Sequence, residues 1–134
     1  MHELFQKADA WSFKVIAAAI EVHKLKGPGI LEPIYEKCML WECHLQHIPV
    51  VQQLPVSIEY KGHVFEQPLR LDLLVDDCLI VELKSVEKIL PIHKAQLLSY
   101  MRLLNKPLGL LINFHEILLK NGIHRLILPG ANQP

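Results

Sequence analysis

The stretch from Arg70 to Ser85, RLDLLVDDCLIVELKS, constrains the fold more than any other part of the chain. Two apolar runs flank Asp76–Cys78, a pattern typical of two antiparallel strands joined by a short loop. Asp72 lies in the first run, and Glu82 and Lys84 lie in the second. A carboxylate that enters a sheet interior without a partner is strongly destabilising. We therefore expect this hairpin to bind a divalent cation, since hard ions bind facing carboxylates.

The length of the connecting loop decides whether these side chains meet. With Asp76–Cys78 as a three-residue loop, Val75 pairs with Leu79, and Asp72 lies opposite Glu82 on one face of the sheet. A two-residue loop would place the two carboxylates on opposite faces. We predict the three-residue loop, with Lys84 on the same face as Glu82. The alternative, a pair of exposed strands with solvated charges, fits poorly with the apolar neighbours of Glu82.

The rest of the chain predicts a mixed α/β domain. Helices are expected over residues 10–26, 32–46 and 91–104, and strands over 50–60, 63–67, 71–75, 79–83, 108–113 and 123–128. Asp9 is the expected N-cap of the first helix, and Pro55 predicts that its strand either bends there or lies at a sheet edge. This order predicts a central mixed β-sheet flanked by helices. We expect one domain over residues 1–134, with residues 1–9 and 129–134 frayed.

Composition limits the cellular setting and the partners. The 14 basic and 14 acidic residues cancel, so any surface that binds a polyanion must come from local clustering. The candidates for such a track are Lys88, Lys94, Arg102, Lys106 and Arg125. Three cysteines without a CxxC pair favour a reducing cytoplasm. No apolar run approaches the ~20 residues of a membrane span, and no signal peptide is recognisable, so we expect a cytoplasmic protein without a membrane partner.

Two further sets of polar residues are candidates for the same site. His93, Gln96 and Tyr100 are spaced i, i+3 and i+7, and therefore share one face of the third helix. Such a face binds a phosphate or the lysine, or is simply solvated. Glu32 lies at the entrance of the second helix, where the helix dipole favours a carboxylate whatever its function.

These residues match known motifs. Asp72 followed by Glu82-Leu83-Lys84 resembles the D…ExK signature of the PD-(D/E)XK nuclease superfamily. Gln96 and Tyr100 resemble the QxxxY motif of its RecB-like branch. The segment Gly29–Tyr35 is similar to the GxxExxY motif that names a family of small proteins in that superfamily, as are residues 109–114 and 122–125 to that family's C-terminal part. Two departures are that no proline precedes Asp72 and that Pro33 follows Glu32.

The resemblance implies a restriction-endonuclease-like core and Mg²⁺-dependent hydrolysis of phosphodiester bonds, with Mn²⁺ as a possible substitute and DNA as the expected substrate. It implies that Asp72, Glu82, the backbone carbonyl of Leu83 and the additional acid Glu32 hold the metal. Lys84 would position the attacking water. Gln96 and Tyr100 would steady the phosphate or the lysine.

Three functions stay open at this point. The first is a metal-dependent nuclease, which the intact acidic residues favour. The second is a catalytically silent nucleic-acid-binding or assembly module with the same fold. The third is a small-molecule phosphodiesterase or another metal hydrolase, which the zero net charge leaves open. Because basic residues are few, a homo-oligomer or a partner subunit is a possible requirement for tight binding to nucleic acid.

Overall fold

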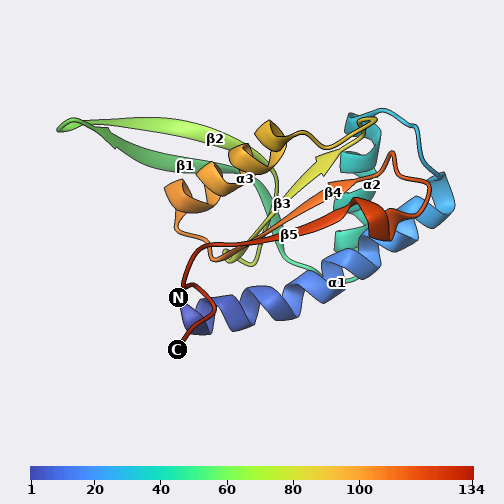
Figure 1. The fold of residues 1–134 in the computed structure, drawn as a ribbon, viewed down its shortest axis with the longest axis horizontal. Helices are drawn as coiled ribbons and strands as arrows, with labels where there is room; N and C mark the ends of the chain where they lie inside the picture. The colour runs from blue at the N-terminus through green and yellow to red at the C-terminus, as the bar shows by residue number, and fades with distance from the viewer.

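A computed structural model describes all residues, 1–134, of the chain (Figure 1). Its elements in order are α1 (His2–Lys26), α2 (Glu32–Leu45), β1 (Val50–Tyr60), β2 (His63–Val75), β3 (Leu79–Lys84), α3 (Pro91–Leu104), β4 (Leu108–Asn113), the short 3-10 helix η1 (Leu119–Gly122) and β5 (Ile123–Ile127). The three predicted helices are present, and the predicted strands are present in order except that residues 63–75 form one strand.

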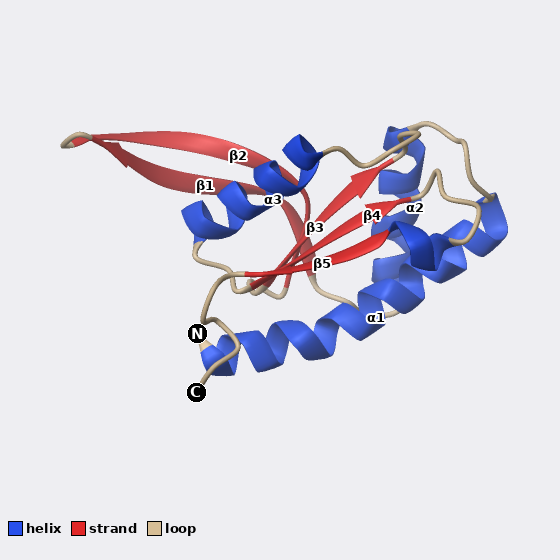
Figure 2. Cartoon of the chain, viewed as in Figure 1, coloured by secondary structure: helices blue, strands red, loops and turns tan.

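The five strands form one mixed sheet in the order β1-β2-β3-β4-β5. Only β3 and β4 run parallel, because α3 connects them as a crossover, and the other neighbours are antiparallel. The helices α1 and α2 cover one face of the sheet, and α3 covers the other (Figure 2). β1 is an edge strand, as Pro55 predicts. The expected α/β architecture, a central mixed sheet flanked by helices, is confirmed.

Two hydrophobic clusters fill the spaces between these layers. The larger cluster packs α1 and α2 against residues such as Leu73, Val81 and Ile112, and the smaller packs α3 against Ile80 and Leu111. Successive residues of β3 therefore alternate between the clusters, as a strand covered on both faces requires. This alternation explains why the two central strands β3 and β4 are almost continuously apolar. It also makes any charged residue within them exceptional.

The β2–β3 hairpin has the predicted register. Val75 pairs with Leu79, and Leu74 pairs with Ile80, so Asp76–Cys78 is the three-residue loop. The loop has no glycine, and instead Asp76 and Asp77 adopt positive φ angles of 44° and 54°. Aspartate tolerates this conformation better than most residues. Three contacts hold the loop: Asp76 accepts a hydrogen bond from Trp11 Nε1 at 2.8 Å and lies 3.4 Å from Lys7 Nζ, and Asp77 pairs with Lys106 at 2.9 Å.

The division of residues 63–75 into two strands is wrong, because β2 is continuous through Pro68. In the register of β1 with β2, Pro68 lies opposite Pro55. Opposed residues in an antiparallel pair exchange either two hydrogen bonds or none, and two prolines can exchange none. Their missing N–H groups therefore face the outer edges, where no ladder bond is lost. The distal parts of β1 and β2 project from the body as a two-stranded arm (Figure 1).

The first helix begins at His2 rather than at Ala10, and Asp9 lies within it rather than at its N-cap. Ala8 is fully buried, and Asp9 forms an ion pair with Arg125 of β5 at 2.5 Å. These tertiary contacts stabilise about two turns of helix that local periodicity does not reveal. At the other end Ala131 is buried with the α3-side cluster. The fraying of residues 1–9 and 129–134 in solution stays a prediction, although residues 2–9 have a regular conformation here.

Gly122, at the end of η1, is expected to be intolerant of a side chain. A Cβ atom at this position would lie 2.4 Å from the backbone oxygen of Asn113. Because that oxygen belongs to β4, relief of the clash requires movement of the backbone. We expect Gly122→Ala to lower the free energy of unfolding by about 2–3 kcal/mol, as overpacking does elsewhere. Urea denaturation measures the change, and a loss below about 0.5 kcal/mol would contradict the close approach.

Candidate active site

Asp72 lies where β2 departs from its regular pairing. Val51 pairs with Leu74 but Gln53 pairs with Arg70, so β2 has extra residues between these pairs and forms a bulge. The regular β2–β3 pairs end at Leu73, and the Asp72 carboxylate takes the next position by accepting the N–H of Leu83 at 2.8 Å. At the bulge, the N–H of Leu83 in β3 is therefore bound by the side chain of Asp72, where a regular sheet would have a backbone carbonyl of β2.

Glu82 is the residue least compatible with an ordinary sheet interior. It faces the α3 side, and its Oε1 is buried without a hydrogen-bond partner. Burial, and then the charge of Asp72, raise the pKa of Glu82 from 4.5 to about 8. The pKa of Asp72 is also raised, mainly by burial, although the hydrogen bond from Leu83 opposes the rise. At neutral pH the two carboxyls therefore need either a shared proton or a cation between them.

Lys84 ends β3 on the same face as Glu82. Its ammonium lowers the pKa of both carboxyls, yet it forms no ion pair with either. The chain around it is fixed by Asn113, which is fully buried. Asn113 donates to the carbonyl of Val86 at 2.9 Å and accepts from the N–H of Val86 at 3.1 Å. Asn113 was not among the predicted site residues. It could have been identified as the one polar residue of an otherwise apolar strand.

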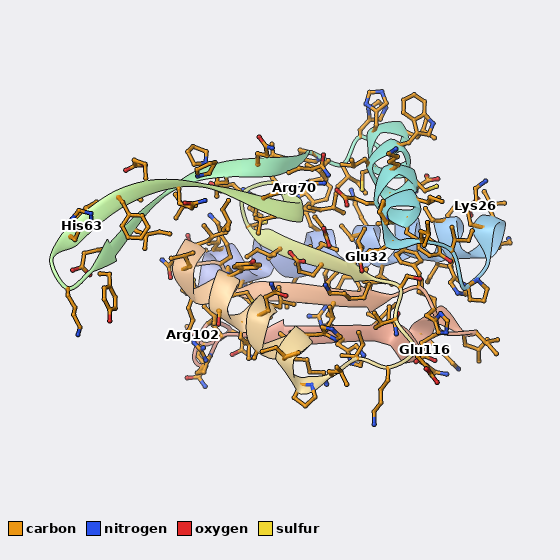
Figure 3. The ribbon with its side chains drawn as sticks, turned by 90° about the horizontal axis from the view of Figure 1, so that it is seen from above. Lys26, Glu32, His63, Arg70, Arg102 and Glu116 are labelled. Atoms are coloured by element: carbon orange, nitrogen blue, oxygen red, sulfur yellow. The ribbon has the colours of Figure 1, made fainter.

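The segment Gly29–Tyr35 positions the start of α2 beside the end of β3. Gly29 has a φ of 88°, which glycine adopts readily. The buried Tyr35 donates its hydroxyl to the carbonyl of Gly27 at 2.5 Å and accepts from the N–H of Ile30 at 3.1 Å. Ser85, directly after Lys84, donates to the carbonyl of Ile30 at 2.5 Å. Glu32, in the first turn of α2, therefore lies close to the C-terminal end of β3 (Figure 3).

Removal of the Tyr35 hydroxyl is expected to loosen this segment. Tyr35→Phe leaves the carbonyl of Gly27 and the N–H of Ile30 without their partner. We expect the free energy of unfolding to fall by about 1–2 kcal/mol, as for other buried polar groups that lose a hydrogen bond. Urea denaturation is the measurement, with Tyr60→Phe as the matched control. Tyr60 is 65% exposed, so an equal loss in both variants would refute the assigned role.

The acid of α2 that interacts with Asp72 is Glu36, which the sequence interpretation missed. Glu36 contributes to the raised pKa of Asp72. It accepts a hydrogen bond from Gln52 Nε2 at 2.5 Å and forms an ion pair with Arg70. Arg70 of β2 is thus linked to α2 through Glu36. Glu36 lies four residues after Glu32, on the same face of α2, and this spacing could have identified Glu36 from the sequence.

Of the three candidate residues on α3, two bind each other and the third caps the helix. Gln96 Nε2 donates to the hydroxyl of Tyr100 at 3.3 Å, so these two residues contact each other as their spacing predicts. Gln96 is exposed, and Tyr100 packs against the α3-side cluster. Neither residue bonds to Lys84. His93 instead caps the helix, because its Nδ1 accepts the N–H of Leu90 at 2.9 Å.

The side chains of the site offer oxygen ligands of the kind that a divalent ion binds. Asp72 and Glu82 provide two facing carboxyls, and the unpartnered buried Oε1 of Glu82 is an atom that a cation would satisfy. No cluster of three or more histidine, cysteine, aspartate and glutamate side chains is present. The predicted convergence is therefore observed for Asp72 and Glu82, and not for Glu32. The ligand roles of Glu32 and of the Leu83 carbonyl stay predictions.

The predicted basic track is smaller than expected. Lys106 pairs with Asp77, and Arg125 pairs with Asp9 on the α1 side of the sheet, away from Glu82. These ion pairs reduce the positive charge that the two side chains add to the track, and their part in binding a polyanion stays a prediction. Lys88, Lys94 and Arg102 form no ion pairs and are exposed on α3 and the loop that precedes it.

No helix of the structure is both long enough and apolar enough to cross a membrane.

Comparison with known proteins agrees with this geometry. A model of the PD-(D/E)XK nuclease superfamily matches residues 9–126, a range that includes the Asp72–Lys84 hairpin residues and also Gln96 and Tyr100 of α3. No curated protein and no solved structure gives a significant match. The five-stranded mixed sheet with helices on both faces is consistent with the restriction-endonuclease-like fold of that superfamily. This chain therefore belongs to the PD-(D/E)XK nuclease superfamily.

Proposed function

We propose that the protein is a metal-dependent nuclease that hydrolyses phosphodiester bonds in DNA, and that it belongs to the GxxExxY branch of the superfamily. The observation that carries the proposal is the half-buried Asp72–Glu82 pair, with a buried, unpartnered oxygen on Glu82 and with Lys84 beside it. Superfamily membership supports a nuclease in general. The choice of DNA and of Mg²⁺ is our inference.

In this proposal Asp72 and Glu82 hold the ion, and Leu83 and Glu32 are the candidate additional ligands. A bound Mg²⁺ would polarise the scissile phosphate and lower the pKa of a water molecule. Asp72 is kept in place by the N–H of Leu83. Lys84, which has no ion-pair partner, is free to donate hydrogen bonds to the attacking water or to a phosphate oxygen.

The remaining polar groups support binding rather than bond cleavage. Gln96 and Tyr100 lie together on α3, which covers the face that carries Glu82. Their role is to position the phosphate or Lys84. Lys88, Lys94 and Arg102 supply the cations that contact the nucleic-acid backbone. Since these are few, we expect weak, salt-sensitive binding unless a homo-oligomer or a partner adds further contacts.

The test is cleavage of end-labelled single-stranded and double-stranded DNA, and of RNA, with Mg²⁺ or Mn²⁺. We expect cleavage of DNA that EDTA abolishes and that Asp72→Asn lacks. Glu87→Gln is the matched control, because Glu87 is an exposed acid near the site that forms no ion pair. Metal-independent binding of DNA without cleavage would favour the silent binding module instead. Cleavage that survives Asp72→Asn would contradict the proposed site.

A further inference from the structure

A shallow groove lies between α1 and the connection from β4 to β5, on the face of the sheet opposite Glu82. It encloses about 420 Å³ and is lined by Ile20, His23, Lys24 and residues 117–120. Figure 2 shows the 3-10 helix η1 beside the second half of α1. The groove has no part in the candidate active site, since α1 packs on the other side of the sheet.

The walls of the groove are fixed in place. The His23 ring donates from Nε2 to the carbonyl of Glu116 at 2.7 Å, and Leu119 is buried beneath the loop. Glu116, at the start of this connection, is labelled in Figure 3. Despite this anchoring, Ile117 is 82% exposed and Leu118 is 55% exposed. A loop that holds large apolar side chains in solvent is typical of a binding surface.

The apolar surface continues along α1. Ile20 is 49% exposed, and Phe13, at a spacing of seven residues, is 64% exposed. Residues at this spacing lie on one face of a helix. Ile20, Ile117 and Leu118 line one groove, and Phe13 lies on the same face of α1 as Ile20. An apolar surface of this kind along a helix suits a second amphipathic helix.

The charges around the groove favour one kind of occupant. The charged or titratable residues that line it, Lys24, Lys120 and His23, are all basic. The neighbouring acids Glu21 and Glu116 are half-buried and do not line it. A second copy of this chain would present the same basic lining at a two-fold interface, so the two grooves would have no charge complementarity. A segment with acidic flanks meets no such repulsion.

We propose that this groove binds an acidic amphipathic helix of a partner protein. The apolar face of that helix lies on Ile20, Ile117 and Leu118, and its flanking carboxylates lie against Lys24 and Lys120. The proposal is independent of the nuclease activity. It assigns to the α1 face a docking function that the Asp72–Glu82 site does not need.

The test uses two fluorescent helical peptides of about 16 residues, each with leucines at i, i+3, i+4 and i+7. One has glutamates on both flanks, and the other has lysines at the same positions. Fluorescence anisotropy measures binding to the full chain. We expect the acidic peptide to bind and the basic peptide not to bind. Leu118→Glu should weaken binding by about tenfold or more, as for a central apolar contact.

Matched variants separate this groove from other exposed apolar residues. Leu45→Glu on α2 is the control for Leu118→Glu, because the two leucines are 54% and 55% exposed. The double variant Lys24→Glu/Lys120→Glu should lose the acidic peptide and gain the basic one, whereas Lys37→Glu should change neither. Circular dichroism confirms that each variant folds. Mn²⁺ affinity should stay unchanged in all of them.

Three results would overturn the proposal. The first is equal binding of both peptides, or of neither at concentrations up to about 1 mM, where affinity is negligible. The second is acidic-peptide binding that Leu118→Glu leaves intact. The third is a wild-type dimer, seen by light scattering, that Leu118→Glu converts to a monomer, because a second copy would then occupy the groove.

Discussion

Replacement of Lys84 by alanine is expected to lower kcat for DNA cleavage by about 10²–10³-fold, the usual range for loss of a positioned acid–base or charge-stabilising group. Lys84 is half-buried at the end of β3, and its ammonium is not engaged in an ion pair. Because it acts on the water or the phosphate rather than on the ion, divalent-ion affinity should remain close to that of the wild type. Single-turnover cleavage and Mn²⁺ titration together measure the two quantities.

Lys88→Ala is the matched control, since Lys88 is an exposed lysine in the loop that follows β3. It should reduce cleavage only a few-fold, through weaker and more salt-dependent substrate binding. The assigned role of Lys84 would be wrong if both alanine variants lost activity equally. It would also be wrong if Lys84→Ala cleaved at the wild-type rate.

Glu82→Gln is expected to stabilise the metal-free protein at alkaline pH. The pKa of Glu82 is about 8 in the folded chain and 4.5 when unperturbed, so the folded state binds more protons between these values. Stability therefore falls as pH rises from about 5 to about 8, with a loss on the order of 2–3 kcal/mol from this group. Glutamine cannot ionise, so the variant should lack most of this decline. Urea denaturation in the presence of EDTA measures the effect.

With a divalent ion bound, we expect the wild type to be more stable than Glu82→Gln, the reverse of their order without metal. A ligand at one hundred times its Kd adds about 2.7 kcal/mol to the folded state. We expect Mn²⁺ to stabilise the wild type by about this amount near pH 8 and to stabilise Glu82→Gln far less. Glu87→Gln, which alters an exposed acid, should behave as the wild type does in both experiments. A wild type whose metal-free stability is flat between these pH values would contradict the buried Asp72–Glu82 pair.

The hairpin and its register could be predicted from the sequence because local rules decide them. A strand buried on both faces requires apolar residues, so the ionisable Asp72 and Glu82 stood out. An odd loop length then fixed them on one face. The left-handed conformation of Asp76 and Asp77 could not be predicted in the same way. It depends on Trp11, Lys7 and Lys106, which are distant in sequence.

The residues that sequence interpretation missed act through tertiary contacts. Glu36 has no motif of its own, and its connection to the site depends on Gln52 and Arg70 from two other elements. Asn113 fixes the chain after Lys84 from the end of a parallel neighbour strand, a contact that only the sheet order reveals. The N-terminal part of α1, from His2 to Asp9, and the continuity of β2 through Pro68 were missed for the same reason.

The most direct test is the position of Mn²⁺ in crystals of the full chain, located by its anomalous scattering. We expect one strong peak within bonding distance of a carboxylate oxygen of Asp72 and of Glu82, at about 2.0–2.4 Å. The same crystals of Glu82→Gln should lack it. Mn²⁺ bound elsewhere on the surface, with the Asp72 and Glu82 carboxyls left to share a proton, would contradict the metal centre and the hydrolytic function built on it.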